Sequence, residues 1–405
     1  MNKNTKRNIK FILPAIIINN IGDVIFDLFI AWGLSASTGM VMNAVYVIGT
    51  SIAFRAILSF FMGAFVDRHS KKQLMIVSHI SSIIVIAVFG LLWEFAKQRI
   101  IIGILFVLLN DINNEMFLRS YISMTADMFD ENTYIKFRSY SSIAVRILVI
   151  GGTVFSGLLI EYLPSYMIFG INIITYFISL LLIAKITYEE VVKKKENNKI
   201  LKQIVEDVKY TYESITKYSF LLAFIVLMFL LNLAYGYIPQ VLPIFKANRI
   251  GSATFLGAMK SAITIGEIIG LFVVGKLSRY VSKTFQASML LNIFIMIILC
   301  VIKSPYLIIA LFGLYGLSDA LTQPLFSYTV SKLDNNNRGK LLGGIDAIIM
   351  FSPSIGIYII SAIYNYNELL GGVTVALIFF IGFCVVSFHT SMKKIVLRGE
   401  EYEKK

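Results

Sequence analysis

The main pattern along the chain is a series of long apolar stretches separated by short polar segments. A helix needs about 20 apolar residues to cross a bilayer, so the pattern predicts transmembrane helices. The stretches lie at roughly 10–35, 41–66, 73–95, 100–127, 137–162, 165–187, 218–245, 252–276, 284–302, 305–331, 340–363 and 369–391. Six of them precede a polar break and six follow it.

The polar break separates two expected halves. It carries Glu189, Glu190 and three lysines from Lys193 to Lys195, followed by an amphipathic stretch near 200–212. Such a stretch lies on a bilayer surface more often than it binds a specific partner. The predicted fold class is an all-α membrane protein with twelve transmembrane helices in two pseudo-symmetric six-helix halves. The halves are residues 1–188 and 218–405, the second ending in a short cytoplasmic tail, with a cytoplasmic linker at 189–217.

Composition agrees with a membrane protein. Of the 405 residues, 57% are hydrophobic and 15% charged, whereas soluble domains have about a quarter of their residues charged. The net charge of +13 is no sign of nucleic-acid binding, because Lys and Arg in cytoplasmic loops orient membrane proteins. We expect no nucleic acid among the partners.

The distribution of basic residues predicts the orientation. With the N-terminus inside, the inner segments hold most of the 37 Lys and Arg residues. The outer segments hold only Lys97, Arg99, Lys246, Arg249 and Lys303. We therefore expect a multi-pass protein of a bacterial cell membrane with both termini in the cytosol. Trp32 and Trp93 fall near outer ends of their spans, where an aromatic belt would place them.

Two segments recur weakly in the second half. The segment from Gly63 to Lys72 has a glycine, an acid–base pair and paired bases, and a copy at 275–283 has lost the acid. Asn110-Asp111 in span four likewise has a counterpart in Ser318-Asp319 of span ten. A duplication of this kind is typical of transporters with two six-helix halves. The chain resembles the major facilitator superfamily over nearly its whole length.

Further motifs refine this resemblance. Gly152 to Gly157 in span five resembles a worn antiporter motif, and Ser352 to Gly356 lies at the matching place in span eleven. Asn337 to Lys340 resembles a stretch typical of the macrolide-efflux-like branch. The resemblance implies a secondary active transporter that exports drugs or metabolites, an efflux antiporter of the multidrug-resistance kind.

The loop after span two is a candidate conformational latch made of Gly63, Asp67, Arg68, Lys71 and Lys72. Asp67 could accept hydrogen bonds from the N-terminus of a neighbouring helix, whose dipole favours an anion. The three bases are expected to face the anionic inner leaflet. The alternative is a plain positive-inside turn.

Charged residues inside the spans are candidates for function, because each costs about 3 kcal/mol at the bilayer centre. The candidates for proton coupling and the transport cavity are Asp23, Asp27, Asp111, Glu115, Glu267, Arg55, Arg119 and Arg146. One interpretation pairs these residues as structural ion pairs. The other leaves a carboxylate without a full partner, so that it carries a proton in exchange for substrate. We rank Asp319 and Asp346 lower because they could lie near helix ends.

Small residues in spans five and eleven predict close helix contacts. Gly152 and Gly157 in span five, with Pro353 and Gly356 in span eleven, are expected to border the interface between the halves. Gly343 and Gly344 add to the cluster in span eleven.

The motif search indicates no cofactor, no metal site and no enzyme chemistry. Cys300 and Cys384 are isolated, and no Walker loop occurs. The leading hypothesis is proton-coupled efflux of an amphipathic small molecule by a monomer, with that substrate, protons and membrane lipids as partners. The alternatives are a lipid or lysolipid flippase on the same fold, and a non-transporting membrane sensor.

Overall fold

The computed structural model describes residues 3–36, 39–188, 200–217, 221–277, 281–331 and 338–388. Within these ranges the secondary structure is helical, and twelve spans are long and apolar enough to cross a membrane. The all-helical fold class is confirmed. The first part of the expected linker, 189–199, and the tail beyond 388 lie outside the described residues.

The helices of the first half follow the apolar stretches closely. They are α1 (Lys3–Ala36), α2 (Val41–Asp67), α3 (Lys71–Gln98), α4 (Ile100–Met128), α5 (Glu131–Tyr162) and α6 (Ser165–Ala184). Side-chain caps fix two of the boundaries. Ser70 accepts a hydrogen bond from the Gln73 N–H at the start of α3, and Asp130 accepts one from the Thr133 N–H at the start of α5.

The second half has more helices than spans. They are α7 (Ile200–Lys217), α8 (Leu221–Gln240), α9 (Leu242–Ile250), α10 (Ala253–Leu277), α11 (Val281–Val301), α12 (Pro305–Ser331), α13 (Arg338–Ile349), α14 (Ser352–Tyr366) and α15 (Glu368–Phe388). Two expected spans are interrupted next to prolines, α8–α9 beside Pro239 and Pro243 and α13–α14 before Pro353. Proline removes a helical donor and clashes with the preceding turn.

The chain forms two compact units. Residues 1–197 and 244–258 make up the first, and residues 198–243 and 259–405 make up the second. The segment 244–258 therefore packs with the first unit although it follows the polar break. The division at 188 and 217 into halves that move separately stays a prediction.

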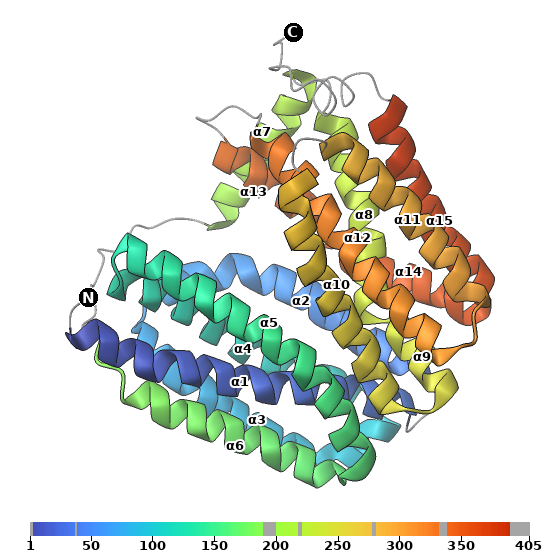
Figure 1. The fold of residues 1–405 in the computed structure, drawn as a ribbon. Helices are drawn as coiled ribbons and strands as arrows, with labels where there is room; N and C mark the ends of the chain where they lie inside the picture. The colour runs from blue at the N-terminus through green and yellow to red at the C-terminus, as the bar shows by residue number, and fades with distance from the viewer. Residues whose placement is uncertain are drawn as a thin grey trace. The chain divides into compact units, whose positions relative to one another are not determined.

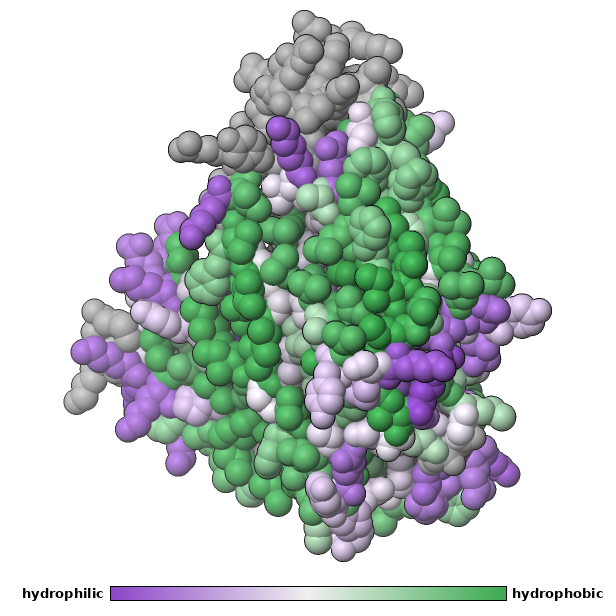
Figure 2. All heavy atoms as spheres, turned by 45° about the vertical axis from the view of Figure 1, so that its right-hand side comes forward, coloured by the Kyte–Doolittle hydropathy of each residue, from purple (hydrophilic) through white to green (hydrophobic). Residues whose placement is uncertain are grey.

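In the first unit α1 packs against α5 and α6, and α4 packs against α2 and α3. In the second, α8 packs against α14, and α11 against α12 and α15. Figure 1 shows α1, α3, α4, α5 and α6 side by side along their length. Hydrophobic side chains cover most of the face seen in Figure 2, as expected of surfaces in contact with lipid.

The amphipathic linker helix α7 packs on α13 in the second unit (Figure 1). Small residues permit the contact: a Cβ placed on Gly343 would lie 2.9 Å from the Asp207 Oδ2 atom, and one on Gly344 would overlap Thr211. Thr211 also donates a hydrogen bond to the Leu341 carbonyl at 3.4 Å. Burial raises the pKa of Asp207, although nearby Lys340 opposes the shift. These glycines of span eleven therefore accommodate the linker helix.

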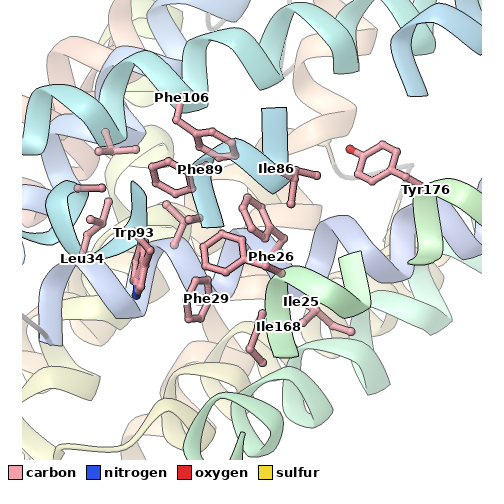
Figure 3. Close-up of a cluster of buried hydrophobic side chains, with 14 residues drawn as sticks. Ile25, Phe26, Phe29, Leu34, Ile86, Phe89, Trp93, Phe106, Ile168 and Tyr176 are labelled. Atoms are coloured by element: carbon pink, nitrogen blue, oxygen red, sulfur yellow. The ribbon is translucent and has the colours of Figure 1, made fainter. Parts of the chain in front are cut away.

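One end of the first unit has an aromatic core. Phe89 stacks on Phe106 with ring centroids 3.7 Å apart, and Trp93 packs on Phe29 at 4.8 Å. Figure 3 shows these rings gathered together, with Tyr176 standing apart from them. Trp93 is only 4% exposed, so its expected place in an interfacial belt is wrong. The bare backbone of Gly33 leaves room for its ring, 2.7 Å from where a Cβ would stand.

Candidate functional site

A layer of polar side chains crosses the first unit between two apolar clusters. The aromatic core lies on one side, and a cluster that includes Ile12, Met75 and Met124 lies on the other. The polar residues occupy the intervening turns of α1, α3, α4 and α6. The buried members are Asn19, Ser78, His79, Ser82, Asn110, Asp111, Asn113, Glu115, Asn172, Thr175 and Ser179. Buried polar groups within membrane helices are costly, so such a layer is a candidate functional site.

Asp23 on α1 lies in this layer with a defined set of donors. Asn19, one turn earlier on the same helix, donates its amide to Asp23 Oδ2 at 2.8 Å. The Tyr176 hydroxyl on α6 lies 2.8 Å from Asp23 Oδ1 and 3.1 Å from Asn114 Oδ1 on α4. Asp23 thus bonds neutral groups of α1 and α6, and Tyr176 extends the network to α4.

Asp111 on α4 is a second carboxylate in the layer and is 5% exposed. Ser51 on α2 donates a hydrogen bond to its Oδ2 atom at 2.7 Å. Arg55, also on α2, interacts electrostatically with both Asp111 and Asp23. The positive charge of Arg55 therefore acts on both acids.

Two further acids of the first half interact with this pair, and one of them, Asp27, is exposed. Asp27 interacts electrostatically with both Asp23 and Asp111, and Glu115 interacts with Asp111. Glu115, which is 7% exposed, also binds Arg119 one turn later, with Nε and Oε2 3.3 Å apart. Four predicted acids and Arg55 are thus brought into one electrostatic cluster. Arg146 lies half-buried on α5.

The second unit holds a smaller acidic site. Asp319 lies in the middle of α12 and interacts electrostatically with Glu267 on α10. Tyr235 and Tyr315 lie within electrostatic range of Asp319. Asp319 therefore does not lie near a helix end, which was the reason for ranking it lower. Asp346 is exposed and lies three residues before the end of α13.

The loop between α2 and α3 differs from the expectation for its bases. Lys71 is 7% exposed, and its Nζ atom lies 3.0 Å from Asp127 Oδ2 at the end of α4. Lys72 donates to the carbonyls of Ala184 and Ile186 at 2.9 and 2.8 Å. Lys71 is therefore directed inward to an acid of its own unit, whereas Lys72 is half-buried and bonds neutral backbone carbonyls.

The rest of the expected latch is open to its surroundings. Asp67 and Arg68 are exposed at the end of α2, and Gly63 is half-buried. Tyr188 adds to the internal network by donating to Asp127 at 3.1 Å. A latch between the halves stays a prediction that rests on Asp67.

The expected small-residue contacts fall within the units. A Cβ on Gly157 would lie 2.6 Å from the Ala253 carbonyl oxygen at the start of α10, and one on Gly152 would lie 3.3 Å from Val24 of α1. In the second unit, Gly356 abuts the backbone of Leu233 on α8. Their assignment to an interface between moving halves stays a prediction.

Pro353 also makes a tight contact inside the second unit. Its Cα and carbonyl oxygen would each lie 2.5 Å from a Cβ on Gly236 of α8. Glycine at 236 therefore lets α8 approach the first turn of α14 closely.

The residues that sequence reasoning missed are the neutral partners of the acids. Tyr176 is the main one, with Asn19, Ser51 and Asn114 as the others. A signal for Tyr176 exists, because Asn172, Thr175, Tyr176 and Ser179 form one polar stripe along an otherwise apolar helix.

The arrangement has the groups needed to bind and release a proton inside a membrane. Carboxylates with neutral hydrogen-bond donors and a shared cation can exist in either protonation state. Among the described residues, no group of three His, Cys, Asp or Glu side chains could hold a metal ion.

Comparisons with known proteins agree on one kind of protein. Residues 8–357 match the family described as the Major Facilitator Superfamily. The multidrug resistance protein MdtG of Salmonella heidelberg is 21% identical over 371 residues, covering 83% of this chain and 88% of its own. MdtG of Salmonella paratyphi A is 22% identical over 373 residues, with the same coverage.

Solved structures show the same fold. A bacterial homologue of the iron transporter ferroportin, in an inward-facing state, has a TM-score of 0.68 at 12% identity, covering 94% of this chain and 99% of its own. The nucleoside transporter NupG has a TM-score of 0.65 at 17% identity, covering 93% and 99%.

Proposed function

Because the chain belongs to the Major Facilitator Superfamily and is thus a transporter, not an enzyme, we propose that it exports an amphipathic small molecule in exchange for protons. The substrate is a drug or a secreted metabolite, and transport occurs by alternating access. The protein works as a monomer in a bacterial cell membrane with both termini in the cytosol.

One observation carries the proposal: four acids and Arg55 interact electrostatically at the polar layer of an otherwise apolar unit. The described cluster holds four acids and two bases, Arg55 and Arg119, so a carboxylate there shares its counter-charge with another. Such a group takes up a proton more readily than an exposed one. Asp23 and Asp27 are the foremost candidates for carrying the proton, followed by Glu115 and then Glu267 of the second unit.

The relatives support the substrate class. MdtG is named as a multidrug resistance protein, and a site with both apolar and polar walls suits a molecule with both kinds of surface. The same scaffold could instead flip lysolipids, so the experiment includes a lysolipid probe.

The test uses the purified protein in liposomes with an imposed pH gradient. Ethidium and a macrolide serve as drug probes, and a fluorescent lysophospholipid serves as the lipid probe. We expect addition of a drug probe to release protons, and Asp23→Asn or Asp27→Asn to abolish that release.

Glu94→Gln is the matched control. Glu94 is an exposed acid of the same unit that pairs with Lys97 at 2.6 Å, away from the polar layer. Proton release that persists in both aspartate variants would remove these acids as carriers. Transport of the lysolipid but of neither drug would indicate a flippase instead of an exporter. Transport of no probe would refute the proposal.

A further inference from the structure

The hydroxyl of Tyr176 lies between two acceptors on different helices. Its oxygen is 2.8 Å from Asp23 Oδ1 on α1 and 3.1 Å from Asn114 Oδ1 on α4. We propose that Tyr176 is a positioning residue that couples the protonation of Asp23 to α4 by switching its single proton between these acceptors. The inference rests on the proposed role of Asp23 as a proton carrier.

The switch follows from counting donors. A phenol has one proton, so Tyr176 donates to one of the two oxygens at a time. While Asp23 is ionised, its oxygen is the better acceptor, because bonds to charged groups are about twice as strong as neutral ones. The amide of Asn114 then receives no proton from Tyr176.

Protonation of Asp23 reverses this pattern. Asn19 already donates to Asp23 Oδ2, so the acid proton belongs on Oδ1, the oxygen that faces Tyr176. The new O–H donates to the tyrosine oxygen, and the tyrosine proton turns to Asn114 Oδ1. A hydrogen bond from α6 to α4 thus appears only when Asp23 carries a proton.

The ring is held so firmly that its proton moves and its oxygen does not. Tyr176 is 2% exposed and packs edge-on against His79 of α3 at 5.1 Å. Gly22 brings α1 close to α6, because a Cβ there would lie 2.6 Å from Asn172 Oδ1. A tightly packed position of this kind allows a change of bond partner without a change of rotamer.

Other groups that could influence the switch come from three helices. Asp27 of α1 acts on both Asp23 and Tyr176, and Arg55 of α2 acts on Asp23. From α3, His79 packs against the ring, and the Ser82 hydroxyl is hydrogen-bonded to the Tyr176 hydroxyl. From α4, the group within hydrogen-bond distance is the neutral Asn114.

The acceptor on α4, Asn114, lies among the charged residues Asp111, Glu115 and Arg119 of that helix. Asn114 directly precedes Glu115, which binds Arg119, and it is three residues after Asp111. A bond gained or lost at Asn114 therefore acts on the helix that carries the other acids of the layer. Protonation at α1 would in this way alter the site on α4 without direct contact between the two acids.

The test follows the protonation of Asp23 directly, without any substrate. The infrared C=O band of the protonated carboxyl is titrated in liposomes between about pH 5 and pH 9, and its loss in Asp23→Asn assigns it. Tyr176→Phe removes a donor to the ionised form. In this variant we expect the midpoint of the Asp23 titration to move to higher pH by about one unit, which is a tenfold change in proton concentration.

Asn114→Leu should shift the midpoint the opposite way. Without Asn114 the tyrosine proton loses its amide acceptor when Asp23 is protonated and keeps only the weaker hydroxyl acceptor of Ser82, so the protonated state is less favourable and the midpoint falls. Tyr121→Phe is the control, because Tyr121 is a buried tyrosine of the same unit whose hydroxyl bonds a neutral Ser141 at 3.2 Å. We expect no shift in that variant.

Opposite shifts in the two variants support the switch. The switch would be overturned by midpoints equal to that of the parent, by shifts of both variants in the same direction, or by the lack of a band assignable to Asp23. If one variant does not reach the membrane, the direction of the other decides. Failure of the proposed function appears separately, as the absence of drug-driven proton release in the parent protein, whatever the infrared midpoints show.

Discussion

Glu161 at the end of α5 binds the first turn of α10, and removing it should loosen that turn. Its Oε1 atom accepts from the Ser252 hydroxyl at 2.6 Å and from the Thr254 N–H at 3.0 Å, and its Oε2 atom accepts from the Thr254 hydroxyl at 2.7 Å. Ser252 in turn caps the Phe255 N–H at 3.1 Å. The carboxylate therefore accepts hydrogen bonds from donors that a helix N-terminus leaves unpaired. Its negative charge also interacts favourably with the dipole of α10.

The size of the effect follows from what is lost in Glu161→Ala. Losing a side-chain cap costs about 0.5–2 kcal/mol, and we take about 1 kcal/mol because the site is exposed. The opening equilibrium of the first turn should then rise about fivefold, since 1.4 kcal/mol corresponds to about a factor of ten. Glu161→Gln keeps an acceptor oxygen and should give a smaller increase.

Hydrogen exchange measured by mass spectrometry on the purified protein tests this prediction. Peptides covering residues 252–258 should exchange about fivefold faster in Glu161→Ala. Glu94→Ala removes another exposed glutamate of the same unit and should leave these peptides unchanged. Unchanged exchange in Glu161→Ala would refute the cap and would mean that backbone contacts such as Gly157 with Ala253 hold the turn.

Two further predictions concern packing and acid stability. Gly157→Leu and Gly356→Leu should lower ethidium turnover more than ethidium binding, because both positions abut backbone. Gly151→Leu, with no atom within 4 Å of its Cβ position, should match the parent, and parental turnover in both test variants would contradict the interface assignment. Bonds from Thr133 hold the pKa of Asp130 below its ordinary value, so the ionised carboxylate stabilises the protein above about pH 3.9 and this stabilisation is lost as pH falls through the lower folded pKa. The melting-temperature advantage of the parent over Asp130→Asn should therefore vanish in acid; a pH-independent difference would contradict this reasoning.

The helical spans could be read from the sequence because of a constraint that acts locally. In lipid each backbone must satisfy its own hydrogen bonds, so a long apolar stretch has a helix as its solution. The predicted stretch at 100–127 matches α4 at Ile100–Met128, and 305–331 matches α12 at Pro305–Ser331. The breaks beside Pro243 and Pro353 were foreseeable from the residues themselves.

The acids of the site were also visible in the sequence, because a charge within an apolar span stands out whatever its partner. Their neighbours were not. Tyr176 belongs to a polar stripe of its helix, but its meeting with Asp23 depends on the rotation of α6 against α1 at Gly22.

The tertiary structure decided which groups compensate each charge. Lys71 was expected at the lipid surface, but the end of α4 brings Asp127 to within 3.0 Å of it. Trp93 was expected at the membrane interface, but Gly33 on α1 leaves room for its ring in the core. Apolar length and charge along the chain determine that helices cross the membrane, whereas the rotation and approach of each helix, set by small residues far apart in the sequence, determine which side chains meet.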